Sequence, residues 1–574
     1  MNRGAGVAIS GMNKRLETAV FFCAALLLWA CGNDRPTKPL PEADQAIPAS
    51  IERHRNANVA MAARNPFLAD SVNPLPHGDP GQQDSSMIPG PMDITRRLES
   101  EEVAYQFLGP GSFGAYVSAE YADGGRVLWV NNVNGLYKLD YETYEVLAHL
   151  PSPASEKYTE EWATAITASL DRNNKTTGVR AAYDAVSPYR DLSGVYLVVG
   201  RNNWIYIADN DGSVSAFGDA SPSDRRSGIE RKAVTKIPDV AAGATVGMNM
   251  TYDGWIILPT EEGYLIALDE ELKRAKTVRL QNADSEDTAS QGVGYGWVRN
   301  GVAVDEAGGI YVASRNHMHK VVWRNETFSI DEKDGAWAAP YRNGGGGGTG
   351  ATPSLMGFGN EDRFVVITDG DKLMNMTLFW RDGIPEDWTP LPGAPSPRIA
   401  GMAPVTMGAL NLQEIQSEQT VVVAGHGALV VNNQPRNAPF FLPTKGRARG
   451  LLIGPLGSNP NFQPYGVQKF HWDAEDRALK RSWVNADVSS PNGVPWVSLG
   501  SGQVYFVGAR DNQWTLEALD WWSGEETFYY IIGGQKFNSQ FSGPFIDEKG
   551  RIAYGTMWGR ARIQPSNTDI SGIE

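Results

Sequence analysis

Two histidines of this chain stand in surroundings that suit acid–base chemistry. His77 lies in the turn-rich run Asn73-Pro-Leu-Pro-His-Gly-Asp-Pro-Gly-Gln-Gln-Asp84, which predicts a fixed extended loop and not a strand. His426 lies between two glycines, where the backbone can approach a ligand closely. Either imidazole could act as a general base. No Gly-x-Ser-x-Gly motif accompanies them, so structural histidines are the alternative interpretation.

The elements that must position such residues are clearest near the end of the chain, over residues 502–533. Three strand-like runs follow one another there, at 504–507, 514–519 and 527–532. The last two are joined by Asp520-Trp-Trp-Ser-Gly524, in which Asp and Ser can bond their own turn backbone and Gly can take positive φ. This pattern predicts an antiparallel meander, and one such meander is too small to fold alone. Trp521 and Trp522 are predicted to pack between neighbouring meanders and not to hold a cofactor.

The meander recurs along the chain, for example over residues 126–149 and 255–280. Copies begin roughly 50 to 70 residues apart, which fits a radial array with loops inserted on one face. We therefore predict an all-β fold, a β-propeller of seven or eight four-stranded blades, with eight favoured. A sandwich or several small barrels is the alternative. Neither fold is expected to repeat a turn that begins with Leu-Asp, as at Leu519-Asp520 and Leu139-Asp140.

Three further local features refine this prediction. A helix is predicted over residues 159–170, inserted in a loop between blades. The last strands, near residues 551–563, are predicted to complete a blade that begins near the N-terminus. The five glycines at 344–348 predict a mobile loop and no P-loop, because no Gly-Lys-Ser/Thr follows.

Composition and charge limit the classes of function. The chain of 574 residues is 41% hydrophobic and 10% aromatic, which is ample for a core. Its net charge of −15 argues against binding of nucleic acid or anionic lipid as the main role of the surface.

The first 30 residues resemble a bacterial lipoprotein signal. Met12-Asn-Lys-Arg15 supplies a positive region, and residues 19–30 form an apolar stretch too short to span a membrane stably. Leu26-Leu-Leu-Trp-Ala-Cys31-Gly resembles a lipobox, which implies lipidation of Cys31. An ordinary cleaved signal peptide or a retained anchor is the alternative. Because Cys23 and Cys31 are the only cysteines, the mature domain is predicted to have no disulfide.

These features divide the chain into a signal peptide over 1–30, a Pro-rich tether over 31–72 and a propeller domain over 73–574. In lipoproteins of this type, glycine directly after the cysteine usually implies export to the outer membrane. The expected location is therefore the outer membrane, with the domain in the periplasm or at the cell surface.

The run Glu517-Ala-Leu-Asp-Trp-Trp-Ser-Gly-Glu-Glu-Thr-Phe528 resembles the repeat of quinoprotein-type (PQQ-repeat) propellers. Such propellers include quinone-dependent dehydrogenases and membrane-anchored scaffolds of outer-membrane assembly. A heme is not expected, because the chain has no Cys-x-x-Cys-His. PQQ is less favoured, because the adjacent-cysteine disulfide that contacts the quinone in many such enzymes cannot form here.

Two Asn-Gly runs, at Asn300 and Asn492, resemble the strand openings of calcium-dependent propeller lactonases, and Asn249 opens a strand at a comparable position. In those enzymes, side-chain oxygens from several blades converge on one Ca²⁺ ion. The resemblance implies a calcium site, and ordinary turn chemistry is the alternative.

Three functional classes follow. A binding or scaffold module is favoured, with an envelope protein or a small-molecule ligand in the propeller channel as its partner. The others are a calcium-dependent hydrolase or lactonase, and a quinone-dependent dehydrogenase.

Overall fold

The computed structural model describes residues 48–566, apart from 56–59, 173–174, 283–296, 409–411, 413, 436, 438–441 and 444–446. Ala43–Glu574 form one compact unit. The predicted signal peptide and Cys31 lie outside the described residues. None of the helices within the described ranges is both long and apolar enough to span a membrane.

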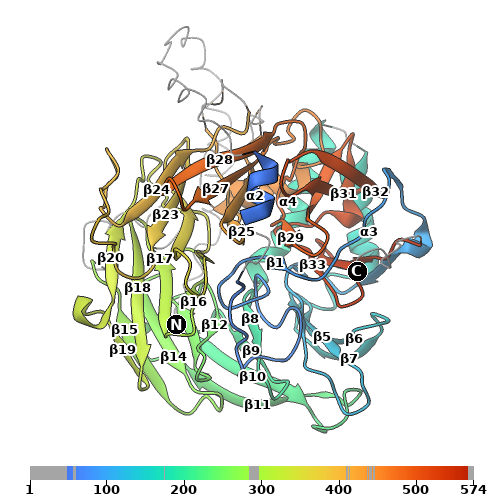
Figure 1. Ribbon diagram of the computed structural model, residues 1–574. Helices are drawn as coiled ribbons and strands as arrows, with labels where there is room; N and C mark the ends of the chain where they lie inside the picture. The colour runs from blue at the N-terminus through green and yellow to red at the C-terminus, as the bar shows by residue number, and fades with distance from the viewer. Residues whose placement is uncertain are drawn as a thin grey trace, which may run out of the picture. The chain divides into compact units, whose positions relative to one another are not determined.

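Eight antiparallel sheets, each built on four strands, are arranged in a ring as the blades of a β-propeller (Figure 1). Blades 1 to 4 consist of β4 (Tyr116–Val117), β5 (Val127–Asn132), β6 (Gly135–Asp140) and β7 (Val146–Pro151); β8 (Leu197–Val199), β9 (Ile205–Ala208), β10 (Ser213–Asp219) and β11 (Ile229–Lys236); β12 (Asn249–Met250), β13 (Ile256–Pro259), β14 (Tyr264–Leu268) and β15 (Ala275–Arg279); β16 (Ala303–Val304), β17 (Gly309–Ala313), β18 (His317–Arg324) and β19 (Thr327–Ser329), with β20 (Trp337–Pro340) also paired to β18.

Blades 5 to 8 continue the same order around the ring. They consist of β21 (Ser354–Met356), β22 (Phe364–Thr368), β23 (Asn375–Trp380) and β24 (Ile399–Pro404); β25 (Val422–Ala424), β26 (Gly427–Val431), β27 (Val467–Asp473) and β28 (Ala478–Asn485); β29 (Trp496–Ser498), β30 (Gln503–Arg510), β31 (Gln513–Asp520) and β32 (Glu526–Gly533), flanked by β1 (Ser85–Ser86) and β2 (Arg96–Arg97); and β33 (Phe545–Ile546), β34 (Ile552–Gly555), β35 (Gly559–Ile563) and β3 (Val103–Phe107).

The predicted eight-bladed propeller and its closure are therefore confirmed. β3, from near the N-terminus, pairs antiparallel with β35 and completes blade 8. The ring is closed by hydrogen bonds between β3 and β35, as the repeat pattern predicted.

The turn chemistry of the repeat is also confirmed. Asp520 Oδ1 accepts hydrogen bonds from the backbone N–H groups of Trp522 and Ser523. Asp140 makes the equivalent bonds in blade 1, with the backbone of Glu142 and Thr143. Each aspartate accepts hydrogen bonds from backbone N–H groups of its turn that have no partner in the sheet. The same local motif therefore forms turns in blades that are far apart in the sequence.

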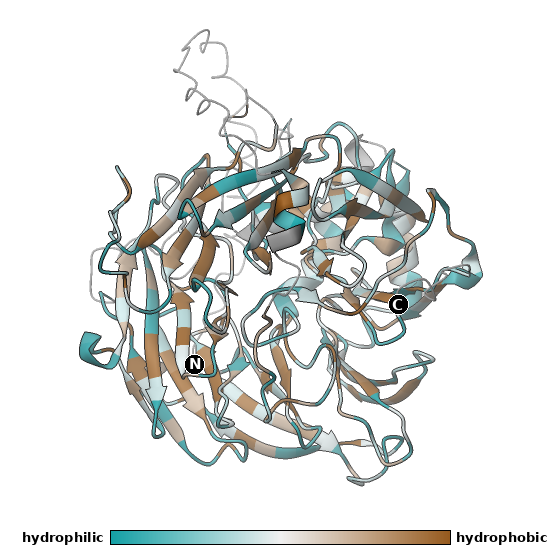
Figure 2. Ribbon diagram, viewed as in Figure 1, coloured by the Kyte–Doolittle hydropathy of each residue, from teal (hydrophilic) through white to brown (hydrophobic). Residues whose placement is uncertain are grey.

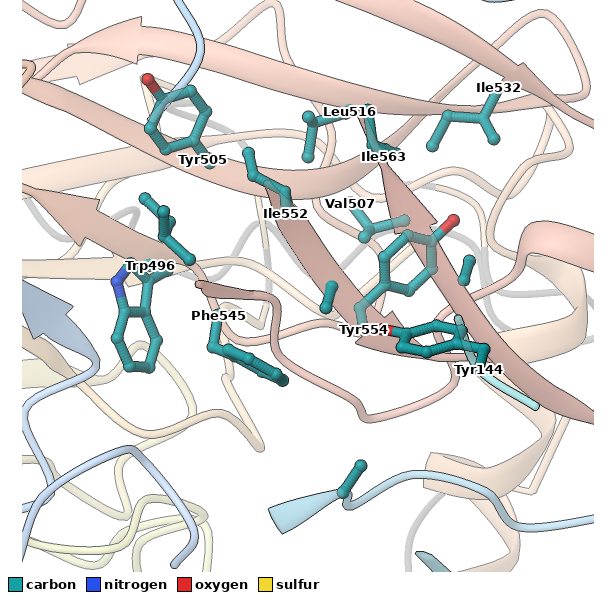
Figure 3. Close-up of a cluster of buried hydrophobic side chains, with 14 of the residues drawn as sticks. Tyr144, Trp496, Tyr505, Val507, Leu516, Ile532, Phe545, Ile552, Tyr554 and Ile563 are labelled. Atoms are coloured by element: carbon teal, nitrogen blue, oxygen red, sulfur yellow. The ribbon is translucent and has the colours of Figure 1, made fainter. Parts of the chain in front are cut away.

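The core lies between neighbouring blades, where apolar faces of two sheets meet. Hydrophobic residues concentrate on the strands and hydrophilic ones on the connecting turns (Figure 2). One cluster joins blades 7, 8 and 1 and includes Trp496, Phe545 and Tyr554, which lie close together in Figure 3. Trp521 is fully buried between blades 6 and 7, as predicted.

A few helices lie outside the ring of strands. They are α2 (Ala49–Arg55), α3 (Glu160–Asp171), α4 (Lys175–Val186), α6 (Arg447–Leu456) and the 3-10 turns η1 (Ser100–Glu102), η2 (Ser187–Asp191), η3 (Asp239–Ala241), η4 (Glu332–Asp334) and η5 (Gln535–Phe537). α3 confirms the helix predicted in this loop, and its N-cap Thr159 accepts from the backbone of Trp162. Side chains of α3, α4 and α6 share one apolar cluster with Trp558 of blade 8. We call these three helices the helical cap.

Residues 73–86, which we call the hub segment, are bonded to one inner strand after another. Its blue trace leads to β1 near the middle of the ring in Figure 1. The hydrogen bonds that its carbonyls accept are Val117 N–H to Asn73 (2.8 Å), Val199 N–H to Pro74 (2.8 Å), Asn249 Nδ2 and Val304 N–H to Pro80 (3.0 and 2.8 Å), Leu355 N–H to Gly81 (2.8 Å), Val423 N–H to Gln83 (2.9 Å) and Val497 N–H to Asp84 (2.9 Å). The hub segment thus joins blades 1 to 7 in chain order. The loop predicted to be fixed and extended is the segment that connects the inner strands of these blades.

The predicted tether, residues 31–72, also contributes contacts where it is described. Asn65 donates to the carbonyls of Met250 and Thr251, and Leu68 forms a β-bridge with Gly200. On α2, Glu52 is fully buried against Lys469 of blade 6. The chain is therefore bonded to the blades before the hub segment begins.

Candidate functional site

A cavity of about 890 Å³ lies where the hub segment, the helical cap and the inner ends of the blades meet. Its lining residues include His77 and Asp84 of the hub segment, Tyr189 of η2, Thr420 before β25, and Leu451 of α6. Trp496 and Phe545, labelled in Figure 3, line it from blades 7 and 8. Pockets that bind small organic ligands have volumes of roughly 300–1,000 Å³, and this cavity falls within that range.

Three polar side chains in this cavity form a hydrogen-bonded row. His77 Nδ1 lies 2.8 Å from Asp84 Oδ2, and His77 Nε2 lies 3.2 Å from Thr420 Oγ1. With Nδ1–H donated to the carboxylate, Nε2 carries the lone pair that accepts the threonine hydroxyl proton. Carboxylate, imidazole and hydroxyl therefore stand in the order of a nucleophilic triad.

Burial and the mutual charges set the protonation of this row. Burial lowers the pKa of His77, but the charge and hydrogen bond of Asp84 outweigh it and hold the pKa above its usual value. Burial raises the pKa of Asp84, against the opposing effect of His77. Burial likewise raises the pKa of the nearby Asp79 to about 7. The hub segment thus holds titratable groups with shifted pKa values beside a cavity, an arrangement common at functional sites.

The backbone around His77 is held in the left-handed region. His77, Gln82 and Asp84 have φ of 64°, 60° and 55°. The Asp84 N–H also donates to the His77 carbonyl, so the two residues are joined by both backbone and side chain. Left-handed non-glycine residues of this kind persist only where their surroundings fix them. Here the carbonyl bonds to the blades do so.

Aromatic rings form much of the remaining wall. Phe113 lies edge-on to Tyr189 at 5.1 Å and to Phe541 at 6.2 Å between ring centroids. Opposite charges are also present, and Arg299 pairs with Glu418 at 2.7 Å. The cavity therefore combines an apolar wall with a few placed polar groups, as small-molecule sites do.

The sequence-predicted site residues fall in different places. His77 lies in the cavity wall, whereas His426 follows β25 and contacts the Asp362 carbonyl with Nε2 at 3.0 Å. Thr420 precedes β25 and His426 follows it, so the two residues stand at opposite ends of that strand. His426 is not among the cavity-lining residues.

The three asparagines do not share a site among the described residues. Asn249 donates to the carbonyls of Pro80 and Val302, and its oxygen accepts from the Met250 N–H. The Asn492 oxygen accepts from Ser539 Oγ, and only Asn300 lines the cavity.

The side-chain oxygens of Asn249 and Asn492 each accept a hydrogen bond within the fold, and the calcium site stays a prediction. Within the described ranges, no group of three or more His, Cys, Asp or Glu residues is placed to hold a metal ion. Asn249 instead binds the hub segment to blade 3, a structural role.

Sequence reasoning missed Thr420 and the pairing of Asp84 with His77. Asp84 could have been noticed, because it stands seven residues from His77 in one rigid loop. Thr420 offers no local signal, since it is 343 residues away and meets His77 only through the ring of blades.

Three solved structures show low similarity to this chain. The quinohemoprotein alcohol dehydrogenase of Comamonas testosteroni is 13% identical, with 89% of this chain and 81% of that chain covered and a TM-score of 0.47. A europium-containing methanol dehydrogenase is 12% identical, over 87% and 91%, with a TM-score of 0.47. BamB from Moraxella catarrhalis is 12% identical, over 63% and 82%, with a TM-score of 0.39. Such scores say nothing about function, and the fold rests on the eight sheets of this chain.

No protein-family model matches the chain. An uncharacterized protein of Archaeoglobus fulgidus is 34% identical over 520 residues, which cover 87% of this chain and 90% of that protein. The chain therefore belongs to the same family as this Archaeoglobus fulgidus protein.

Proposed function

We propose that this protein is a membrane-anchored lipoprotein whose propeller is a binding module for a small organic molecule. The observation that carries the proposal is the cavity of about 890 Å³ with its apolar wall and the row of His77, Asp84 and Thr420. The lipobox-like run before Cys31 supports an anchor in the outer membrane. The domain then faces the periplasm or the cell exterior.

The cavity suits binding because its walls come from separate, rigid elements. The hub segment is fixed by carbonyl bonds to successive blades, and the helical cap is fixed by its own apolar cluster. A preformed site loses little conformational entropy when a ligand enters.

A ligand screen with matched variants tests this proposal. Small organic molecules are tested for a rise in the melting temperature of the purified protein, and hits are measured by calorimetry. Val195→Trp, at a partly exposed position on the cavity wall, should weaken binding about tenfold or more by filling the site. Val234→Trp is the control, because Val234 is similarly exposed on β11 away from the cavity. An equal loss of affinity in both variants, or binding unaffected by Val195→Trp, would contradict a cavity site.

Co-purification of an envelope protein without any ligand would favour the scaffold alternative.

Hydrolysis is the second candidate function, and the triad-like row favours it. His77 Nε2 is placed to take the proton of Thr420 while Asp84 orients the ring. The chain itself would supply the nucleophile and the base, so this candidate differs from the calcium-dependent hydrolase expected from the asparagines.

An ester and a lactone, p-nitrophenyl butyrate and γ-butyrolactone, test it. Thr420→Val should lose turnover about 100-fold or more, whereas Thr420→Ser should retain it, because only the hydroxyl is needed. The neutral imidazole is the active form, so kcat/KM should rise with pH through a value above the usual pKa of histidine. Asp84→Asn should move that midpoint to lower pH. Turnover that survives His77→Ala would show that the row is structural.

Lipid attachment and cofactor content are checked separately. Cys31→Ser should release the protein from the membrane fraction, while the Cys23→Ser control should leave it there. The quinone-dependent alternative predicts that addition of PQQ produces a bound-quinone absorbance, with Ca²⁺ present and absent as the two arms.

A further inference from the structure

We propose that the cavity contains an anion-binding subsite formed by Arg560, Tyr116 and Tyr189, so that its ligand carries a carboxylate or phosphate group. This inference rests on the proposed binding function and names the class of ligand. It concerns a part of the wall separate from the row of His77, Asp84 and Thr420.

Arg560 reaches the cavity from the interior of blade 8. It lies on β35, is 1% exposed and lines the cavity. Its partner across the sheet is Gly555, where an added Cβ would lie 2.9 Å from Arg560 Nη1. The missing side chain at Gly555 therefore leaves room for the guanidinium.

No carboxylate pairs with Arg560 in the part of the chain that the structure describes. Its Nη1 donates to the Phe113 carbonyl at 3.3 Å, and its buried Nε has no hydrogen-bond partner. Three acids line the cavity, Asp84, Glu261 and Glu418; Asp84 pairs with His77 and Glu418 pairs with Arg299.

A buried charge without a counterion is costly, and burial lowers the pKa of this guanidinium. A neutral side chain of similar volume would serve packing at less cost. The charge is explained if a ligand anion completes the pair.

Two tyrosines on the same wall supply further donors. The Tyr189 hydroxyl is buried without a hydrogen-bond partner, and its ring is held edge-on against Phe113. Tyr116, 5% exposed, lines the cavity from β4. A phenol donates readily to an anionic oxygen, and a guanidinium offers a planar fork of N–H groups that matches carboxylate and phosphate.

The apolar wall indicates what the anion is attached to. Phe113, Phe541 and Trp496 line the same cavity. These rings would cover the apolar body of a ligand whose charged end meets Arg560. The class of ligand is thus an amphiphilic organic anion, such as an aromatic or aliphatic carboxylate or a phosphate ester.

Benzoate and phenyl phosphate are the probes, with the neutral benzamide as their matched control. Affinities are measured by calorimetry on the full mature chain at constant ionic strength. We expect both anions to bind at least about tenfold more tightly than benzamide, since hydrogen bonds to a charged group are the stronger ones. A preference of phenyl phosphate over benzoate, or the reverse, distinguishes the two anionic groups.

Arg560→Gln should lower affinity for the anions about 10- to 100-fold and leave benzamide unchanged. Arg562→Gln is the matched control, because Arg562 lies two residues along the same strand, is also buried and does not line the cavity. Tyr189→Phe removes one unpartnered oxygen and should weaken the anions several-fold without lowering the melting temperature.

Arg560→Met separates a ligand-binding role from a structural one. Because no carboxylate of the described residues pairs with this charge, although Nη1 bonds the Phe113 carbonyl and the Tyr144 side chain is a further partner, its removal should keep or raise the melting temperature of the ligand-free protein. A large drop would mean that Arg560 is structural and would overturn the proposal.

Equal binding of benzamide and the anions, or an anion preference that survives Arg560→Gln, would overturn the subsite while leaving the binding cavity in place. If neither the anions nor benzamide binds, while other molecules bind in a manner sensitive to Val195→Trp, the subsite is again rejected and the cavity is retained.

Discussion

At the scale of single residues, a buried ion pair joins α2 to blade 6. Glu52 forms an ion pair with Lys469, and both side chains are fully buried. Lys469 Nζ also donates to the Trp521 carbonyl at 2.9 Å and lies 4.0 Å from the centroid of the Trp521 ring. Glu52 thus fixes α2 to blade 6.

Loss of the negative charge alone should be strongly destabilising. Glu52→Gln leaves Lys469 buried without its counterion and is expected to cost about 3–5 kcal/mol of docking free energy for α2. Proteolysis within α2 should become faster, and urea denaturation should show the loss of stability. The double variant Glu52→Gln with Lys469→Met should recover much of the stability, because it removes both charges. Equal stability of Glu52→Gln and the wild type would contradict this account.

The same pair predicts the pH dependence of α2 docking. Burial raises the pKa of Glu52, but the hydrogen bond with His471 and the charge of Lys469 outweigh it, so the pKa lies below its usual value of 4.5. A carboxyl with a lowered pKa contributes its full stability above the unfolded value and loses it as pH falls through the folded value. Protection of α2 against hydrogen exchange should therefore be constant at neutral pH and should fall below about pH 4.5. A profile that is flat down to pH 3 would contradict it.

At the scale of elements, the hub segment is the least forgiving part of the chain. Gly78 has φ of +79°, and an added Cβ would lie 2.5 Å from Cη2 of Trp496. Gly78→Ala combines left-handed strain with displacement of a core ring and is expected to cost about 2–4 kcal/mol. Gly124→Ala is the matched control, because Gly124 has φ of +77° but nothing within 4 Å of the added atom.

The control should cost only about 1 kcal/mol, the conformational part alone. The difference between the two free energies of unfolding, measured in urea, reports the contact with Trp496. If both variants lose the same free energy of unfolding, the contact between the added methyl group at residue 78 and Trp496 has no energetic cost.

The blades could be predicted from the sequence because each one carries its own local chemistry. The aspartate of Asp520-Trp-Trp-Ser-Gly524 and that of Asp140-Tyr-Glu-Thr-Tyr144 bond their turns without help from distant residues. The rigid loop around His77 was visible for the same reason, through its prolines and glycines. Its role was not, because the bonds that make it a hub use backbone carbonyls, which carry no side-chain signature.

The site was predicted only in part, since its members meet through the closed ring. His77 was identified, but Thr420 and Arg560 lie in strand-like surroundings that look no different from the remaining blades. The Asn-Gly runs suggested calcium because they share a short pattern with metal-dependent propellers. Asn249 binds the hub segment and Asn492 accepts from Ser539, and the calcium site stays a prediction.

At the scale of the whole molecule, stability depends on the closure between β3 and β35. Tyr105 lies opposite Ala561 in this pair, so a disulfide there joins residues from the two ends of the described domain. Tyr105→Cys with Ala561→Cys should stabilise the oxidised protein by about 4 kcal/mol, because a very long loop is closed. Tyr264→Cys with Arg279→Cys, within blade 3, is the control and should give less. Melting under oxidising and reducing conditions measures both, and a larger gain from the local crosslink would mean that the closure does not limit unfolding.

The hub segment also has a consequence for how this family can change its sequence. Its carbonyls meet the blades in chain order, so the spacing of its residues is shared by blades 1 to 7 at once. Apart from positions such as Gly78, a side chain there can be exchanged if the backbone is kept, but a single inserted or deleted residue shifts the partner of every later blade. Related proteins should therefore vary in the lengths of the loops on the blades and keep the length of this segment. Residues 73–86 can then serve as the reference segment for aligning the blades of related sequences.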